Sequence, residues 1–168
     1  CYVNGMGNVV FENSNIYCTS GMEDELNAAI IHAGQGVVKF LNTDVEGNNN
    51  CRTVINYVGG KIYATNSDFK NSNQYYWGVY NESGTIFLDN CRSFGLLNYD
   101  GVYADNCWFN NEVYSEGEMH LSNSKIFGPT GIAGGRSFID NCECYYRAAS
   151  QVRLDAILVE KKGTLMIS

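Results

Sequence analysis

The sequence has little proline, few positive charges and no long apolar stretch. Proline occurs once in 168 residues, and Lys and Arg number 11 against 18 Asp and Glu, which gives a net charge of −7. Nucleic acids and anionic membrane surfaces attract clustered Lys and Arg, so this balance argues against both as partners. No stretch approaches the roughly 18 apolar residues of a membrane span, and the first residues lack the charged and apolar regions of a signal peptide. We therefore expect neither nucleic-acid binding nor membrane insertion.

The abundant residues are glycine and asparagine. Hydrophobic residues make up 45% of the chain, which excludes simple disorder, and the length suits about one compact domain. Gly occurs 18 times and Asn 21 times. With so little proline, this pairing indicates many chain reversals of another kind, which is a reason to look for a repeat.

A unit that begins with Gly and ends with Asn recurs along the chain. The units begin at Gly7, Gly36, Gly60, Gly84, Gly101, Gly117 and Gly135. They end at Asn13, Asn42, Asn66, Asn90, Asn106, Asn123 and Asn141. An eighth unit starts at Gly163 and stops at Ser168, where its Asn is due. Successive Asn residues are separated by 29, 24, 24, 16, 17 and 18 positions, so the unit is constant and the linkers vary.

Each unit predicts short strands on both sides of its Asn. The residues four and two positions before Asn are mostly apolar, as at Val38 and Phe40, and this period-two alternation is typical of a strand with one face toward a core. A small residue follows Asn, and an apolar residue usually returns two positions later, as at Val45. Asn suits the corner between the two strands because it tolerates the left-handed conformation. A third apolar patch, such as 29–31, precedes most of the Gly positions.

Three short strands per unit, with a corner at the same place, describe a coil. Each coil exposes strand edges above and below, so stacked coils satisfy backbone donors and bury a continuous core. The sequence resembles the right-handed parallel β-helix superfamily, the pectate-lyase-like fold, and the corner Asn residues resemble its asparagine ladder. The alternative, an antiparallel sandwich, fits the recurrent Asn less well.

We therefore predict an all-β, right-handed parallel β-helix of about seven to eight coils over residues 1–168. No terminal cap is visible, so the segment is expected to be a fragment of a longer chain. Ser20 and Glu23 have capping-box spacing, which predicts a short helix within 20–27. Residues 147–153 form the other long connection.

On the strand before Asn, the residues three positions and one position before Asn point outward. In a stack of coils each of these positions forms a vertical file, and successive strands, the rungs of the stack, are about 4.8 Å apart. The first file contains Tyr63, Phe87, Tyr103, His120 and Phe138, and the second contains Asp89, Asp105 and Asp140. Apolar ring faces beside hydrogen-bonding carboxylates are typical of a sugar-binding groove. An exposed aromatic stripe can equally mark an interface with another subunit or a loop. We predict these aromatic residues and Asp140 to be glycan-binding or interface residues.

Asp89 and Asp105 are weak candidates for catalysis. As neighbours in one file they would lie near the ~5 Å separation of the carboxyl groups of retaining glycosidases, but any two acids on adjacent rungs would do so. Of the strings that the resemblance to polygalacturonases implies, only Asn-Thr-Asp occurs, at Asn42-Thr43-Asp44, and its Asn is a corner residue. No arginine stands in a string typical of pectate lyases. We predict no catalytic residue, cofactor or metal site in this segment; an enzyme here would be a polysaccharide lyase or glycoside hydrolase.

Four of the seven cysteines occupy inward positions. Cys91, Cys107 and Cys142 follow Asn where other units have Ser or Thr, and Cys144 stands two positions later. They are expected to act as small buried hydrophobes. Cys91 and Cys107 on adjacent rungs could form a disulfide, whereas the odd total and core position favour reduced thiols and assembly in a cytosol. Structural or surface roles are expected for the two histidines, His32 and His120.

Long β-helices with aromatic outer faces, acidic charge and reduced thiols resemble viral shafts and spikes, above all phage tailspikes. That resemblance implies an attachment segment of a virion tail appendage, assembled in host cytosol, homotrimeric, and in contact with host cell-surface polysaccharide. The implication is an analogy at the level of the fold. The alternatives are a secreted polysaccharide lyase or hydrolase and a non-catalytic bacterial surface adhesin.

Overall fold

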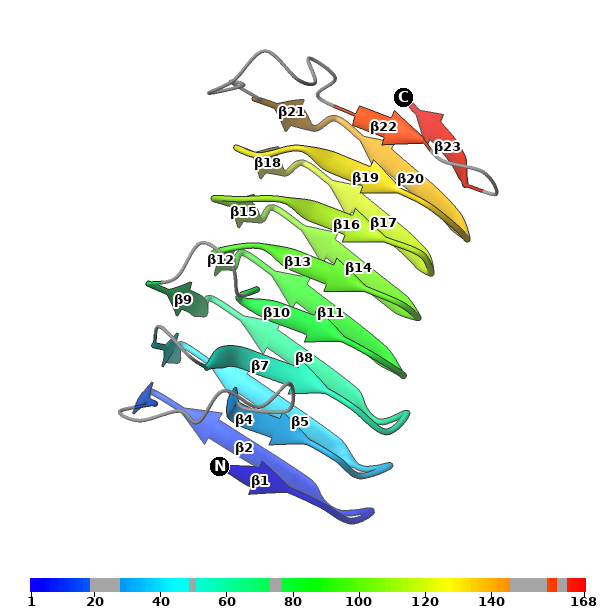
Figure 1. The fold of residues 1–168 in the computed structure, drawn as a ribbon. Helices are drawn as coiled ribbons and strands as arrows, with labels where there is room; N and C mark the ends of the chain where they lie inside the picture. The colour runs from blue at the N-terminus through cyan, green and yellow to red at the C-terminus, as the bar shows by residue number, and fades with distance from the viewer. Residues whose placement is uncertain (19–27, 49–50, 73–76, 146–156, 160–162) are drawn as a thin grey trace.

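The computed structural model is a right-handed parallel β-helix whose first seven coils each contribute one strand to each of three parallel sheets, and whose last coil contributes described strands to two of them (Figure 1). It describes residues 1–18, 28–48, 51–72, 77–145, 157–159 and 163–168. Among these residues there is no helix, and therefore none long and apolar enough to cross a membrane. The helix predicted within 20–27 and the connection 147–153 lie outside the described residues.

The strands of the first sheet follow in the order β1 (Tyr2–Val3), β4 (Ala28–His32), β7 (Arg52–Asn56), β10 (Val79–Asn81), β13 (Leu96–Asn98), β16 (Val113–Ser115), β19 (Thr130–Ile132) and β22 (Ile157–Val159). Those of the second sheet are β2 (Asn8–Glu12), β5 (Val37–Leu41), β8 (Lys61–Thr65), β11 (Thr85–Asp89), β14 (Gly101–Asp105), β17 (Glu118–Ser122), β20 (Arg136–Asp140) and β23 (Thr164–Ile167). The third sheet contains β3 (Asn15–Tyr17), β6 (Asp44–Gly47), β9 (Asp68–Asn71), β12 (Arg92–Ser93), β15 (Trp108–Phe109), β18 (Lys125–Ile126) and β21 (Glu143–Cys144).

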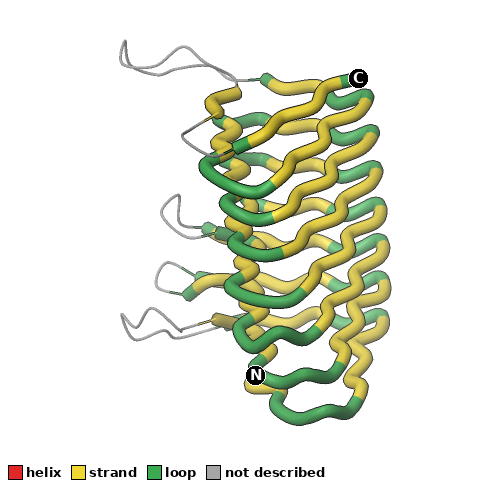
Figure 2. Tube along the Cα trace, turned by 90° about the vertical axis from the view of Figure 1, so that its right-hand side faces the viewer, coloured by secondary structure: helices red, strands yellow, loops and turns green. Residues whose placement is uncertain are grey.

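The coils stack in a constant register, so equivalent residues of successive units lie above one another (Figure 2). Ile86 of β11, for example, pairs with Ile62 of β8 and Val102 of β14. All three side chains are buried, as the alternation predicted, and columns of this kind make one continuous core. The outward residues between them form the two files of the second sheet.

The left-handed Asn corner is confirmed in all seven units, and hydrogen bonds between the Asn side chains confirm the ladder. Each corner Asn has a φ between 48° and 53°, and no other non-glycine residue in the described part of the chain has a positive φ. Asn is selected because it enters the left-handed region at little cost and its amide can bond the neighbouring coil. Each side-chain amide donates to the Asn of the preceding coil, at 3.2 Å (Asn42 to Asn13), 3.2 Å (Asn66 to Asn42), 2.7 Å (Asn90 to Asn66) and 3.4 Å (Asn106 to Asn90).

The small residue after each Asn has a chemical role as well as a small volume. Its hydroxyl or thiol donates to the carbonyl oxygen two residues earlier, for example Ser67 Oγ to Thr65 O at 2.9 Å and Cys107 Sγ to Asp105 O at 3.1 Å. The same bond occurs in all seven units. Ser, Thr and Cys therefore exchange at this position because all three carry a donor. None of the seven cysteines, all of which lie in the described part of the chain, forms a disulfide.

A second, buried ladder was missed at the sequence level. It runs along the ends of the first-sheet strands: His32 Nδ1 to Asn56 Oδ1 at 2.9 Å, Asn56 Nδ2 to Asn81 Oδ1 at 3.0 Å, Asn81 Nδ2 to Asn98 Oδ1 at 2.8 Å, and Asn98 Nδ2 to Ser115 Oγ at 2.9 Å. All five side chains are buried. The signal was a polar residue directly after each apolar patch, which looks like the start of a turn.

Candidate functional site

The aromatic file forms a continuous stack of rings on the outer face of the second sheet. One ring comes from each of β8, β11, β14, β17 and β20, and the constant register places them in line. Ring centroids are separated by 4.7 Å (Tyr63–Phe87), 5.2 Å (Phe87–Tyr103), 4.7 Å (Tyr103–His120) and 4.4 Å (His120–Phe138). The interplanar angles are 6°, 14°, 17° and 19° in the same order.

This stacking determines which part of each ring a ligand can reach. Parallel rings about 4.8 Å apart, the spacing of the rungs, cover one another's faces. The sequence pattern predicted exposed ring faces beside carboxylates; the structure instead turns the faces of Phe87, Tyr103 and His120 toward their neighbours. The ring edges therefore point outward. Beyond the two ends of the stack the next rungs hold Lys39, in register with Tyr63, and Met166, in register with Phe138.

A shallow groove of about 320 Å³ runs beside the ring stack. One side is lined by Tyr63, Phe87, Tyr103 and His120, and the other by the file of Thr65, Asp89, Asp105 and Ser122. The groove spans β8 to β17. Of the predicted site residues, Phe138 continues the ring stack and Asp140 continues the carboxylate file, but both lie beyond the groove lining. Asp140 accepts a hydrogen bond from Ser168 Oγ at 2.7 Å.

Asp105 takes the place of Asn106 as the acceptor for Asn123 in the asparagine ladder. Asn123 donates its amide to Asp105 Oδ1 at 2.8 Å rather than to Asn106, and Ser122 Oγ donates to the same oxygen at 2.7 Å. These hydrogen bonds, the Ser122 bond first, lower the pKa of Asp105. A general acid requires the opposite shift, so Asp105 is suited to remain an ionised acceptor.

Asp89 is the free carboxylate of the groove. It pairs in register with Asp105 of the next strand, so the two backbone positions lie on adjacent rungs. The Asp89 side chain makes no hydrogen bond or ion pair with any of the residues that the structure describes. Both of its oxygens are therefore available to a ligand.

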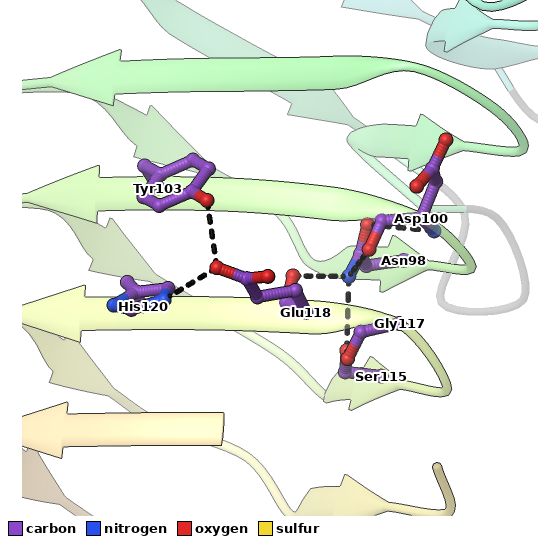
Figure 3. Close-up of polar contacts among 7 residues, drawn as sticks. All are labelled: Asn98, Asp100, Tyr103, Ser115, Gly117, Glu118 and His120. Atoms are coloured by element: carbon purple, nitrogen blue, oxygen red, sulfur yellow. Dashed lines mark hydrogen bonds and ion pairs between the residues drawn. The ribbon is translucent and has the colours of Figure 1, made fainter. Parts of the chain in front are cut away.

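Glu118 is a site residue that the sequence pattern did not indicate. Its Oε1 accepts Tyr103 Oη at 2.7 Å and His120 Nε2 at 2.8 Å, and so fixes two neighbouring rings of the stack (Figure 3). The Tyr103 bond, followed by the His120 bond, lowers the pKa of Glu118, and the same contact raises the pKa of Tyr103. Equivalent positions hold Lys61, Thr85 and Gly101, so no repeat pointed to an acid here.

A second aromatic strip lies on the outer face of the third sheet and was also missed. Trp108, Phe127 and Tyr145 stack at 4.8 and 5.1 Å and are 38%, 39% and 51% exposed. Arg92 lies over the Trp108 ring at 5.8 Å. Phe127 and Tyr145 each follow their corner Asn by four positions but Trp108 follows by two, so no single offset from Asn links all three rings.

The remaining motifs have structural roles. In Asn42-Thr43-Asp44, Asn42 is a ladder residue, Thr43 is buried, and Asp44 forms an ion pair with Lys70 at 2.6 Å. His32 is buried and hydrogen-bonded, as predicted for a structural histidine.

Within the described ranges, no group of three or more His, Cys, Asp or Glu residues is arranged to hold a metal ion. The chain matches no family model, no curated protein and no solved structure, so the fold and these side chains carry the functional argument.

Proposed function

We propose that this chain is an attachment segment that binds an extended polysaccharide along the outer face of its second sheet. The observation that carries the proposal is the groove, because its lining repeats on each rung from β8 to β17. Each rung offers one ring edge and one hydroxyl or carboxylate, at intervals of about 4.8 Å. A polymer of similar units suits a site of similar units, and a site built on strands is rigid before the ligand arrives.

The chemistry of the lining favours a sugar chain over an apolar peptide. Ring edges supply apolar contact, and the opposite side supplies oxygen acceptors that hydroxyl groups can satisfy. Because Asp105 is held as an ionised acceptor, we propose binding without cleavage. The adjacent position of Asp89 keeps a polysaccharide lyase or hydrolase as the second candidate.

We further propose the setting that the fold suggests: a virion tail appendage, assembled as a homotrimer, that contacts host cell-surface polysaccharide. Its support is the β-helix architecture and the lack of disulfides among the seven described cysteines, which suits a reducing cytosol. A bacterial surface adhesin would use the same groove. Light scattering tests the setting: a stable trimer is expected, and a monomer at working concentrations would argue against the appendage.

A glycan array with detection of reducing ends tests the binding function. The sharpest variant is Thr65→Trp, which keeps a strand-forming residue and fills the groove. Its matched control is Leu41→Trp, which adds the same side chain to the same file one rung below the groove lining. We expect Thr65→Trp to weaken binding by at least about tenfold and Leu41→Trp to leave it unchanged. Equal binding by both variants would refute the site, and released reducing ends would favour the enzyme.

A further inference from the structure

The groove offers a ligand many acceptors and few donors. Its lining contains two carboxylates, Asp89 and Asp105, and one histidine, but no lysine or arginine. Both oxygens of Asp89 are free, and Asp105 uses only Oδ1 for its two bonds, which leaves Oδ2 for a ligand. Ser122 already donates its hydroxyl proton to Asp105. The hydroxyls of Tyr63 and Thr65 line the other end of the groove. At Asp89 and Asp105 the ligand must therefore supply the donors.

Charge restricts the ligand further. Asp89 and Asp105 stand in register on adjacent rungs, about 4.8 Å apart along the stack, so two like charges face the same segment of ligand. A ligand that covers them removes water, and a desolvated carboxylate without a strong partner is costly. A hydroxyl offers an ordinary hydrogen bond, an ammonium group offers a stronger charge-assisted one, and a ligand carboxylate would add a third negative charge.

Basic residues lie beyond both ends of the groove. At one end Arg136 of β20 is in register with Glu118, one rung after the lining ends. At the other end Lys39 pairs with Tyr63 one rung before the lining begins, and Lys61 is on the strand of Tyr63. None of these three basic residues lines the groove. The positive group of a ligand is therefore expected at the Asp89–Asp105 segment.

We propose that the groove selects a polysaccharide with free amino groups, and that one protonated amine lies between Asp89 and Asp105. This inference rests on the proposed function, since it names the class of sugar that the same groove takes. It sets the chain apart from binders of acidic, uronate-rich polysaccharides, whose carboxylates these two aspartates repel.

Titration calorimetry with three oligosaccharides of matched length tests the inference: a fully deacetylated glucosamine oligomer, its N-acetylated form and a galacturonate oligomer. The measurement is made at low salt and about pH 6, where amines with a pKa of about 7.7, the value for an α-amino group, are protonated. We expect the amine form to bind about tenfold tighter than the N-acetylated form, and the galacturonate to bind weakest. Added salt should reduce the difference.

Two variants that each remove one negative charge distinguish binding of the amine at Asp89 and Asp105 from a general attraction of cationic ligands to an acidic protein. Asp89→Asn should abolish the preference for the amine form. Glu12→Gln removes a free carboxylate at the equivalent position three rungs away and should retain it. Loss of the preference in both variants, or in neither, would refute the amine site.

The failures of the two proposals are distinguishable. Tight binding of the N-acetylated or galacturonate oligomer that Thr65→Trp abolishes would overturn the amine inference and leave the groove as a polysaccharide site. If none of the three oligomers binds and the glycan array is also blank, both proposals fail.

Discussion

Replacement of one ladder residue, Asn66→Ala, isolates what the asparagine corner contributes to stability. Asn66 has a φ of 51°, and its side chain donates to Asn42 at 3.2 Å and accepts from Asn90 at 2.7 Å. Alanine in the left-handed region costs about 1 to 2 kcal/mol. The two lost hydrogen bonds are solvent-exposed and contribute about 0.5 kcal/mol each. We therefore expect a loss of about 2 to 3 kcal/mol in the free energy of unfolding.

Two further variants separate the backbone part from the amide part. Asn66→Gly keeps the left-handed conformation and loses only the hydrogen bonds, so it should cost about 1 kcal/mol. Asn106→Ala loses a single bond of 3.4 Å, because Asn123 donates to Asp105 instead of to Asn106. Its cost should be smaller than that of Asn66→Ala by about 0.5 kcal/mol.

Urea denaturation followed by circular dichroism measures these differences as shifts of the midpoint at constant slope. Equal midpoints for Asn66→Ala and Asn106→Ala would refute the idea that ladder bonds carry part of the stability. An Asn66→Gly protein as stable as the original would show that the amide contributes nothing and that the corner conformation alone selects Asn.

Three other predictions follow from buried groups. Burial, partly offset by the Asn56 hydrogen bond, lowers the pKa of His32. The unfolded chain therefore binds the proton more readily, and the free energy of unfolding should fall as the pH drops below about 6.5. Urea denaturation at several pH values should show this fall, and His32→Asn should remove it. Asn81→Ala should lower the free energy of unfolding by about 3 kcal/mol or more, which is more than at the exposed ladder, because it deprives the buried Asn56 amide and the Gly101 carbonyl of a partner. Equal urea midpoints for Asn81→Ala and Asn66→Ala would contradict this. Thiol titration should find seven thiols in the denatured chain, and fewer than seven would reveal a disulfide. In the folded chain Cys107 should react slowly, because the hydrogen bond with the Cys91 thiol and burial raise its pKa.

The candidate site was predictable in part. The offsets from Asn correctly placed Tyr63, Phe87, Tyr103 and His120 in one file and Asp89 beside them, because an outward position in one strand remains outward in every stacked strand. The offsets could not show that the rings cover one another's faces, since that depends on side-chain rotamers. Nor could they show that the groove ends before Phe138 and Asp140.

Contacts between coils were the part that the sequence did not reveal. Glu118 reaches Tyr103 on the preceding rung, and Asn123 bonds Asp105 across coils instead of its ladder neighbour. Each of these choices is decided by a competition among nearby donors and acceptors once the register is set. The linkers between units vary in length, so sequence distance alone does not define that register.

The sequence by itself determined the repeat, the left-handed Asn corner and the inward alternation, because these are local conformational preferences written again in every unit. Tertiary structure alone decided the buried ladder from His32 to Ser115, the edge-on ring stack and the hydrogen bond of Asn123 to Asp105. The physical reason is that strand pairing brings side chains from different coils to within hydrogen-bonding or stacking distance, and their partners are selected there by geometry and charge.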